Sequence, residues 1–335
     1  MSEFRVGITP DVLGSNGEPI FGREVLGLLD ADGIAWEYMA KQEGGVLAPA
    51  QAARYDAICA MLTRVTSASL AGSDRRLKLI ARFGVGYDTI DVPACTAAGI
   101  LLTIAPDGVR RPVATSALTF VLMLAQKVLI KDRLTRADRW SEKLDHIGTG
   151  LTGRTLGSIG LGNIGAELFR LARPLEMKGI AHDPFADPML AAELGVGLVD
   201  METLFRESDF LAVNCPLSEA TRGLVSTRLL GMMKPSAYLI NTARGPIVDE
   251  HALYESLASG RLAGAGLDVF EEEPTPVSNP LLQLDNVIVT PHGICFTDEC
   301  MRRLAESAFR AVLDVAAGRT PRYVVNPLGS ERPRH

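Results

Sequence analysis

The second half of the chain contains an arginine, two acids and a histidine at points where predicted strands give way to loops. Arg244, Asp268 and His292 each follow a different strand, and Glu273 comes five positions after Asp268. In an open α/β sheet, ligands bind at the carboxyl ends of the strands. Taken singly, these residues could be a solvated charge, a cap, a structural histidine and a surface acid. Taken together, they form a set that can act on a small anion.

The chemistry of these side chains suits the reduction of a 2-oxo acid. A planar guanidinium binds a carboxylate through two hydrogen bonds and polarises the neighbouring carbonyl, so Arg244 is expected to hold the substrate. An imidazolium can deliver a proton to a developing alkoxide near neutral pH, which is the acid/base role expected of His292. A carboxylate close by keeps an imidazolium charged, so Glu273 is expected to pair with His292. A nicotinamide would supply the hydride.

A glycine-rich turn between a predicted strand and a predicted helix indicates a dinucleotide site. The strand Thr155–Ile159 runs directly into Gly160-Leu161-Gly162-Asn163-Ile164-Gly165, which has the spacing G-x-G-x-x-G. The three glycines allow a tight turn, a close approach of pyrophosphate to the backbone, and close packing of helix on strand. The N-terminus of the following helix, whose apolar stripe is Ile164, Leu168, Leu171 and Leu175, attracts the phosphates.

An acid at the end of the next strand suggests which dinucleotide binds. Asp183 follows a strand at residues 179–182 and lies 18 positions beyond Gly165. An acid at about this separation accepts hydrogen bonds from an adenosine ribose. A 2′-phosphate would meet its negative charge, and residues 184–187 supply no arginine to receive that phosphate. The prediction is therefore NAD rather than NADP.

The composition is that of a two-domain globular protein. The 335 residues are 47% hydrophobic and 22% charged. The net charge of −6 and the lack of a basic run argue against nucleic acid as a partner. The most apolar stretch, residues 117–125, is too short to span a bilayer. The five cysteines are scattered without metal-ligand spacing, so we expect no metal site and a cytoplasmic location.

Predicted strands and helices alternate along the chain, which indicates doubly wound parallel sheets of the α/β class. The first half has strands at residues 4–8, 36–39, 56–62 and 77–83 and a helix at 21–31. The turn at 84–86 could offer backbone amides to a small anion, or be an ordinary tight turn. In the second half, strands are expected at 210–214, 237–242, 264–268 and 286–290, and helices at 229–233, 249–259 and 297–317.

Two segments in the middle of the chain have other roles. Residues 111–130 read as a long apolar helix, opened by Pro112, that is buried against more than one neighbour and bridges the domains. Residues 131–150 are polar and charged, with Trp140 among them. This second segment could be a linker or an arm that covers a partner subunit.

A series of motifs in fixed order resembles the D-isomer-specific 2-hydroxyacid dehydrogenase family over nearly the whole chain, including its phosphoglycerate dehydrogenases and glyoxylate/hydroxypyruvate reductases. The motifs are ARFGVGYDTIDVPACTAAGI, TIAPDGVRRPVATSALTFVLMLA, GLGNIG with HDP, NCPLSEATRGLVS, MMKPSAYLINTARGPIVDE, GAGLDVFEEEP, VTPH and VVNP. The resemblance implies a Rossmann NAD-binding domain, residues 107–296, inserted into a flavodoxin-like substrate domain made of residues 1–106 and 297–335, with the site in the cleft.

The resemblance also implies residue roles. It gives Arg244, His292 and Glu273 the roles derived above, and it places Val85 and Gly86 against the substrate carboxylate. It implies a homodimer formed through the bridging helix and the arm. The residues it places along the cofactor, besides the glycine turn and Asp183, are Cys215, Pro216, Thr221, Thr242, Ala243 and Asp268.

The sequence departs from the family pattern around the expected substrate. Bulkier residues follow the histidine in His292-Gly293-Ile294-Cys295-Phe296-Thr297, where the family usually has small ones, and Ile104 stands where asparagine is common. A familiar substrate therefore cannot be carried over. Arg64 falls near a position that holds phosphate in phosphoglycerate dehydrogenases, but it could equally be a surface arginine. We expect no regulatory domain after residue 335, which weakens the case for an amino-acid-inhibited biosynthetic enzyme.

Two other functions stay open. An NADH-sensing, non-enzymatic corepressor would also resemble this family, although the Arg, Glu and His set is intact here. A formate dehydrogenase would need no proton donor and has glutamine where this chain has Glu273. Turnover of 2-oxo acids with NADH distinguishes these functions from the dehydrogenase.

Overall fold

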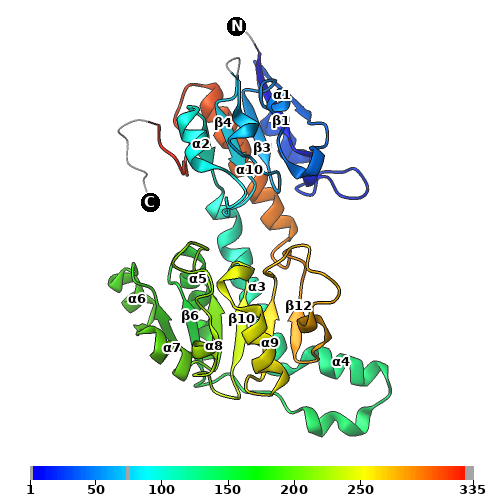
Figure 1. The fold of residues 1–335 in the computed structure, drawn as a ribbon, viewed down its shortest axis with the longest axis vertical. Helices are drawn as coiled ribbons and strands as arrows, with labels where there is room; N and C mark the ends of the chain where they lie inside the picture. Colours follow the sequence, from blue (N-terminus) through cyan, green and yellow to red (C-terminus); the bar gives the residue numbers. More distant parts are fainter. Residues whose placement is uncertain (1–2, 73–75, 329–335) are drawn as a thin grey trace. The chain divides into compact units, whose positions relative to one another are not determined.

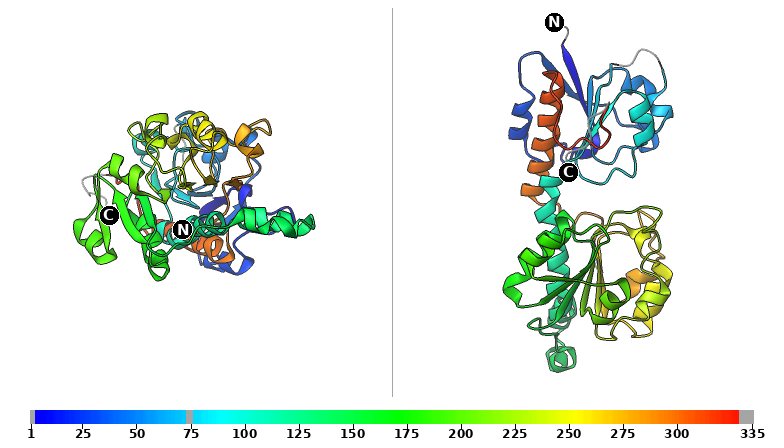
Figure 2. Two further views of the ribbon diagram at one scale, coloured as in Figure 1. Left: turned by 90° about the horizontal axis from the view of Figure 1, so that it is seen from below. Right: turned by 90° about the vertical axis from the view of Figure 1, so that its left-hand side faces the viewer.

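The computed structural model describes residues 3–72 and 76–328, and the chain divides into two compact units. Unit 1 consists of Met1–Val109 and Phe296–His335, and unit 2 of Arg110–Cys295. Each unit is a parallel sheet covered by helices on both faces (Figures 1 and 2). This architecture confirms the predicted α/β class with two doubly wound sheets.

Unit 1 has a five-stranded parallel sheet in the order β2-β1-β3-β4-β5, which is the flavodoxin-like order. Helices α1 (Pro49–Ala52) and α2 (Val92–Ala97) pack on one face, while α10 (Asp298–Ala316) packs against β3 and β4 on the other. The chain therefore returns to this sheet after unit 2 is complete. The strands are β1 (Phe4–Ile8), β2 (Ile34–Tyr38), β3 (Ala57–Ala60), β4 (Leu79–Arg82) and β5 (Leu101–Thr103).

Unit 2 has a seven-stranded parallel sheet in the order β12-β11-β10-β9-β6-β7-β8. The strand order reverses between β6 and β9, which is the kind of position where α/β sheets bind ligands. The strands are β6 (Thr155–Ile159), β7 (Lys178–His182), β8 (Val196–Leu198), β9 (Phe210–Val213), β10 (Tyr238–Asn241), β11 (Gly264–Leu267) and β12 (Val287–Val289).

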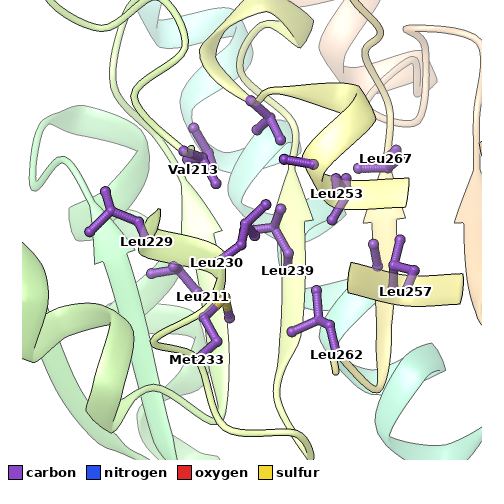
Figure 3. Close-up of a cluster of buried hydrophobic side chains, with 14 of the residues drawn as sticks. Leu211, Val213, Leu229, Leu230, Met233, Leu239, Leu253, Leu257, Leu262 and Leu267 are labelled. Carbon is purple, nitrogen blue, oxygen red and sulfur yellow. The ribbon is translucent and has the colours of Figure 1, made fainter. Parts of the chain in front are cut away.

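Alternate residues of these central strands enter two separate apolar cores. Leu211, Val213 and Leu239 pack against α7 (Met201–Glu207), α8 (Thr227–Leu230) and α9 (Glu250–Ala258), as Figure 3 shows for α8 and α9. Phe210, Ala212 and Ile240 point to the other face, against α3 (Pro106–Gln126), α5 (Asn163–Ala172) and α6 (Pro188–Leu194). Burial on both faces explains why these strands read as continuous apolar runs.

Side-chain caps fix the starts of two predicted helices. Thr297 accepts a hydrogen bond from the Cys300 N–H at the start of α10, and Asp249 accepts one from the Ala252 N–H at the start of α9. Each cap stabilises its helix by about 1 kcal/mol. The helices predicted at 297–317 and 249–259 are confirmed, and each begins within one residue of its predicted start.

The prediction of one helix at 111–130 is wrong at both ends. Helix α3 begins at Pro106, so Pro112 lies inside it, and α3 ends at Gln126. Lys127 then adopts a left-handed conformation (φ 53°), and α4 (Val128–Arg136) follows at an angle of 56°. Within the described residues, no single helix is long and apolar enough to cross a membrane, although α3 and α4 pass that test as a bent pair.

Other segments differ from the prediction in length or type. The helix expected at 21–31 is a short 3₁₀ helix, Arg23–Leu28, which starts after the left-handed Gly22. Residues 131–150 contain the end of α4 and a 3₁₀ helix, Trp140–His146. Several short helices and strands were not predicted, namely α1, α2, β5, α6, β8 and α7. Short elements carry few periodic residues, so their signal in the sequence is weak.

Candidate active site

The glycine turn lies between β6 and α5, as its spacing predicts. Gly160 has a left-handed φ of 98°, and a Cβ there would lie 3.0 Å from the Asn214 backbone, so only glycine fits without strain. Gly162 is the N-cap of α5, where a Cβ would meet nothing within 4 Å. Asn163, Ile164 and Gly165 form the first turn of α5. The N–H groups in the first turn of a helix have no partner within the helix, which suits them to a pyrophosphate.

Asp183 lies directly after β7 and is fixed by two backbone hydrogen bonds. Its Oδ2 accepts from the Leu161 N–H at 2.8 Å, and its Oδ1 accepts from the Phe185 N–H at 2.8 Å. One of these donors belongs to the glycine turn itself. The structure therefore brings together the two parts of the predicted dinucleotide site.

The segment after β9 borders the same turn. Cys215 and Pro216 follow Asn214, whose N–H donates to the Ile159 carbonyl at the end of β6. Burial, reinforced by the charge of Asp183, raises the pKa of Cys215 to about 11. The Thr221 hydroxyl donates to the Pro216 carbonyl at 2.7 Å, so Thr221 shapes this loop.

Arg244 sits in a tight loop after β10, where Thr242 and Ala243 connect it to the strand. Asn241, which is 1% exposed, accepts from the Ala243 N–H at 3.1 Å and donates to the Arg244 carbonyl at 3.0 Å. A Cβ on Gly245 would overlap the Phe270 backbone, so this glycine permits direct contact with the next loop. Arg244 is near enough to Glu273 for its charge to lower the pKa of that acid.

Glu273 and His292 are joined by a side-chain hydrogen bond. The His292 Nδ1 and the Glu273 Oε2 are 2.7 Å apart, and the Glu273 Oε1 accepts from the Phe270 N–H at 3.0 Å. Burial raises the pKa of Glu273, but the bond to His292 and the Phe270 amide outweigh it, so the pKa is lowered. An ionised carboxylate can only accept, so Nδ1 carries the shared hydrogen and Nε2 is left for chemistry.

Asp268 holds the turn that carries His292. Its carbonyl accepts from the His292 N–H at 2.8 Å, and its Oδ1 accepts from the Gly293 and Ile294 N–H groups at 2.9 and 3.1 Å. His292 has a left-handed φ of 50°, a conformation that costs about 1 kcal/mol or more and persists only where its surroundings enforce it. The predicted place of Asp268 along the cofactor stays a prediction, but its hydrogen bonds also hold the turn that carries His292.

The residues predicted to bind substrate from the first half of the chain belong to unit 1. Val85 and Gly86 follow β4, and the Arg82 Nε donates to the Gly86 carbonyl, which fixes this turn. Arg64 is exposed, and its backbone pairs with Gly45 and Leu47. Ile104 donates its N–H to the Tyr323 carbonyl at 3.2 Å. Substrate binding by these residues stays a prediction.

Sequence reasoning missed Ser158, Asn214, Asn241 and Gly245. Each lies at or near the carboxyl end of a strand, within two positions of a residue that the sequence singles out, or directly after one. For Ser158, Asn214 and Asn241 the available signal is a polar residue within or directly after an apolar strand, since a buried polar group needs a partner.

Comparison with known proteins identifies the family. The model of the D-isomer specific 2-hydroxyacid dehydrogenase NAD-binding domain matches residues 118–293, which lie within unit 2. A D-3-phosphoglycerate dehydrogenase from Archaeoglobus fulgidus is 38% identical over 273 residues, which cover 82% of this chain and 52% of that protein. The chain thus spans about half the length of that relative.

Other relatives match over most of their length. A glyoxylate reductase from Korarchaeum cryptofilum is 37% identical over 81% of this chain and 82% of its own. The crystal structure of a D-lactate dehydrogenase from Aquifex aeolicus, complexed with NAD and lactic acid, is 28% identical with a TM-score of 0.80, covering 93% of this chain and 96% of that one. The chain therefore belongs to the D-isomer specific 2-hydroxyacid dehydrogenase family of NAD-dependent oxidoreductases.

Proposed function

We propose that this protein interconverts a small 2-oxo acid and its D-2-hydroxy acid, with Arg244, Glu273 and His292 as its catalytic residues. The single observation that carries the proposal is the 2.7 Å bond between His292 Nδ1 and a Glu273 carboxylate whose pKa is lowered. A histidine held in this way presents Nε2 as the atom that gives or takes a proton. The relatives named above act on 2-hydroxy or 2-oxo acids, which supports the substrate class.

In this proposal each side chain has one task. Bound NADH supplies the hydride. Arg244 binds the substrate carboxylate and polarises the carbonyl through its planar set of donors. His292 gives its Nε2 proton to the oxygen as the carbonyl becomes an alcohol, while Nδ1 stays bonded to Glu273. In the reverse direction Nε2 takes the proton from the alcohol.

The cofactor-binding residues fit NAD. Gly162 leaves space at the N-cap of α5, where backbone N–H groups can hold the pyrophosphate. The Asp183 carboxylate has each oxygen fixed by a backbone N–H, so it is presented in one orientation to an adenosine ribose. The same charge disfavours a 2′-phosphate. We propose that Cys215, Pro216, Thr221, Thr242, Ala243 and Asp268 lie along the rest of the cofactor.

We also propose a homodimer with α4 and the following segment at its interface, in a cytoplasmic protein. Trp140, Leu144 and Ile147 support the interface, because they are 61%, 72% and 72% exposed. Exposed apolar side chains gathered on one segment mark a surface for association. Sedimentation velocity should give the mass of a dimer for the native chain and of a monomer for a triple Trp140→Ser, Leu144→Ser, Ile147→Ser variant.

Oxidation of NADH by a panel of 2-oxo acids tests the function. The panel contains glyoxylate, hydroxypyruvate, pyruvate, phosphohydroxypyruvate and bulkier 2-oxo acids. The kcat/KM values should rank these acids by how well they fit the site. Recognition of phosphate by Arg64 would give phosphohydroxypyruvate the highest value. Arg244→Ala should lower kcat/KM at least about 1000-fold for every acid, because the substrate is no longer held and its carbonyl is no longer polarised. Glu273→Gln should lower kcat/KM about 10- to 100-fold, because the proton donor His292 is impaired.

NADH affinity is the control, since neither residue belongs to the glycine turn, and it should stay within about twofold in both variants. Retained turnover in Arg244→Ala would sink the assignment. A protein that binds NADH but turns over none of the acids would favour the sensor function, which has no use for the Glu273–His292 bond.

A further inference from the structure

The peptide group between Gly160 and Leu161 is held by a side chain at each end. Its carbonyl accepts a hydrogen bond from the Ser158 hydroxyl at 2.6 Å, and its N–H donates to the Asp183 Oδ2 at 2.8 Å. A trans peptide is planar and directs its C=O and N–H to opposite sides. A side chain that fixes the carbonyl therefore also fixes the direction of the N–H that Asp183 accepts.

Asn214 fixes Ser158 in turn. The Asn214 Nδ2 donates to the Ser158 Oγ at 2.9 Å, so the serine oxygen accepts this bond and directs its own hydrogen to Gly160. Ser158 lies on β6 and Asn214 directly follows β9, the two strands between which the sheet order reverses. Hydrogen bonds thus run without a gap from the end of β9 across the glycine turn to the end of β7.

The glycines of the fingerprint make room for these bonds. A Cβ on Gly165 would overlap the Gly160 carbonyl oxygen and lie 3.2 Å from the Ser158 Oγ. A Cβ on Gly160 would lie 3.0 Å from the Asn214 carbonyl carbon. The space that glycine leaves is therefore filled by polar contacts as well as by close packing of helix on strand.

Ser158 is an unusual residue for its position. It is 0% exposed near the carboxyl end of an apolar strand, where a hydroxyl costs free energy unless both of its bonding capacities are used. Its two partners, Gly160 and Asn214, meet that requirement. Asn214 commits its amide donor to Ser158, while its Oδ1 is buried with no partner among the described residues.

We propose that Ser158 and Asn214 are positioning residues that set the orientation of Asp183 through the Gly160–Leu161 peptide and so set the preference for NAD over NADP. The inference rests on the assignment of Asp183 to the adenosine ribose. Without the Ser158 hydroxyl, the peptide can rotate, the Leu161 N–H no longer restrains Asp183, and the carboxylate can swing away from a 2′-phosphate. Discrimination between the two dinucleotides then weakens.

The test is the ratio of the dissociation constants for NADPH and NADH, measured by fluorescence titration of the full chain without substrate. Ser158→Ala should lower this ratio about three- to tenfold, the size of one lost hydrogen bond. Asn214→Ala should lower it in the same direction by less, because Ser158 can still reach Gly160. Ser208→Ala is the matched control, since Ser208 is also 0% exposed and donates to a backbone carbonyl at 2.6 Å.

Ser208→Ala should lower the melting temperature without changing the ratio, because Ser208 does not touch the glycine turn. A ratio in Ser158→Ala equal to that of the native protein, or an equal fall in Ser208→Ala, would overturn the inference. If Ser158→Ala does not fold, Asn214→Ala takes its place as the test. A ratio in Asn214→Ala equal to that of the native protein would then overturn the inference.

Asp183→Ala separates this inference from the assignment beneath it. A lowered ratio in Asp183→Ala with a native ratio in Ser158→Ala refutes the positioning role alone. A native ratio in Asp183→Ala refutes the ribose assignment and the positioning role together. Lowered ratios in both variants support the proposal.

Discussion

The two sheets are built alike at their amino ends and differently at their carboxyl ends. In unit 1, Asp56 precedes β3 with a side chain that is 6% exposed. It accepts from the Arg5 N–H on β1 at 3.0 Å and from the Arg76 guanidinium at 2.7 Å. Burial raises the pKa of Asp56, but these bonds outweigh it and hold the pKa below its ordinary value.

Unit 2 repeats this arrangement. Asp209 precedes β9, is 8% exposed, and accepts from the Thr155 N–H on β6 at 2.8 Å and from the Lys234 ammonium at 3.0 Å. Its pKa is lowered for the same reasons. In both units a buried acid therefore joins the unit's first strand to a neighbouring strand of the sheet, β3 in unit 1 and β9 in unit 2, with a cation to balance the charge.

The carboxyl ends of the two sheets differ in what their backbone N–H groups bind. In unit 1 the chain's own Asp11 accepts from the Leu62 and Thr63 N–H groups at 2.7 and 3.1 Å. In unit 2 the N-cap of α5 is Gly162, which brings no side chain to the amides that follow. The amino ends thus serve stability in both units, while the glycine turn of unit 2 leaves donors for a ligand.

Among the changes that test this comparison of the two units, the largest expected effect comes from Gly245→Ala, at the carboxyl end of unit 2. The new Cβ would overlap the Phe270 backbone, which cannot move without displacing Glu273. We expect kcat/KM to fall by about two orders of magnitude, because small displacements of catalytic groups are costly.

Gly7→Ala in β1 is the matched control for steric crowding. Its Cβ would lie 2.8 Å from the Met39 side chain and 3.0 Å from the Tyr55 ring, which are side chains rather than backbone. Urea unfolding should show a loss of about 1 kcal/mol with kcat/KM retained. Native activity in Gly245→Ala would show that the contact between its loop and Phe270 does not position the site.

Asp209→Ala and Asp56→Ala should each destabilise the protein by about 2 to 4 kcal/mol, because a backbone N–H and a cation lose their buried partner. Neither change touches the glycine turn, so NADH affinity at low temperature should stay native. Asp132→Ala, which breaks the exposed pair with Arg136, should leave the stability measured by urea unfolding nearly unchanged. A marked difference between the Asp56 and Asp209 variants would contradict the equivalence of the two amino ends.

The smallest of the expected effects is the change in melting temperature when the pH is lowered within the moderate range. Asp56 and Asp209 have pKa values below the ordinary 3.8, so their contribution is complete above that pH and is lost as pH falls through the lowered values. The melting temperature should therefore fall more steeply below about pH 4 than above it. Asp209→Asn should be less stable at neutral pH and flatter in acid; an unchanged slope would rule out Asp209 as a source of acid sensitivity.

Local signals made much of the fold predictable. The helix α10 is predicted at 297–317 and lies at Asp298–Ala316, and the β6–α5 turn is predicted from its glycine spacing. The start of α3 is not predicted, because Pro106, Asp107 and Gly108 resemble a loop in sequence. Gly108 sits inside that helix because a Cβ there would crowd Leu304, a contact between segments far apart in the chain.

The site was predictable as a set of residues but not as a geometry. Arg244, Glu273 and His292 could be named from their positions after strands. The bonds from Asp268 to the His292 turn, and from Ser158 to Gly160 and Asn214, depend on how neighbouring strands align. Such pairings join residues from separate parts of the sequence, so no local pattern contains them.

The high pKa of Cys215 lowers the reactivity of its thiol. With a pKa of about 11, roughly one thiol in ten thousand is ionised at neutral pH. Peroxides and alkylating reagents attack the thiolate, so this residue beside the glycine turn should resist both. The protein can therefore be handled in air, or labelled at an engineered surface cysteine, with little risk of damage to Cys215.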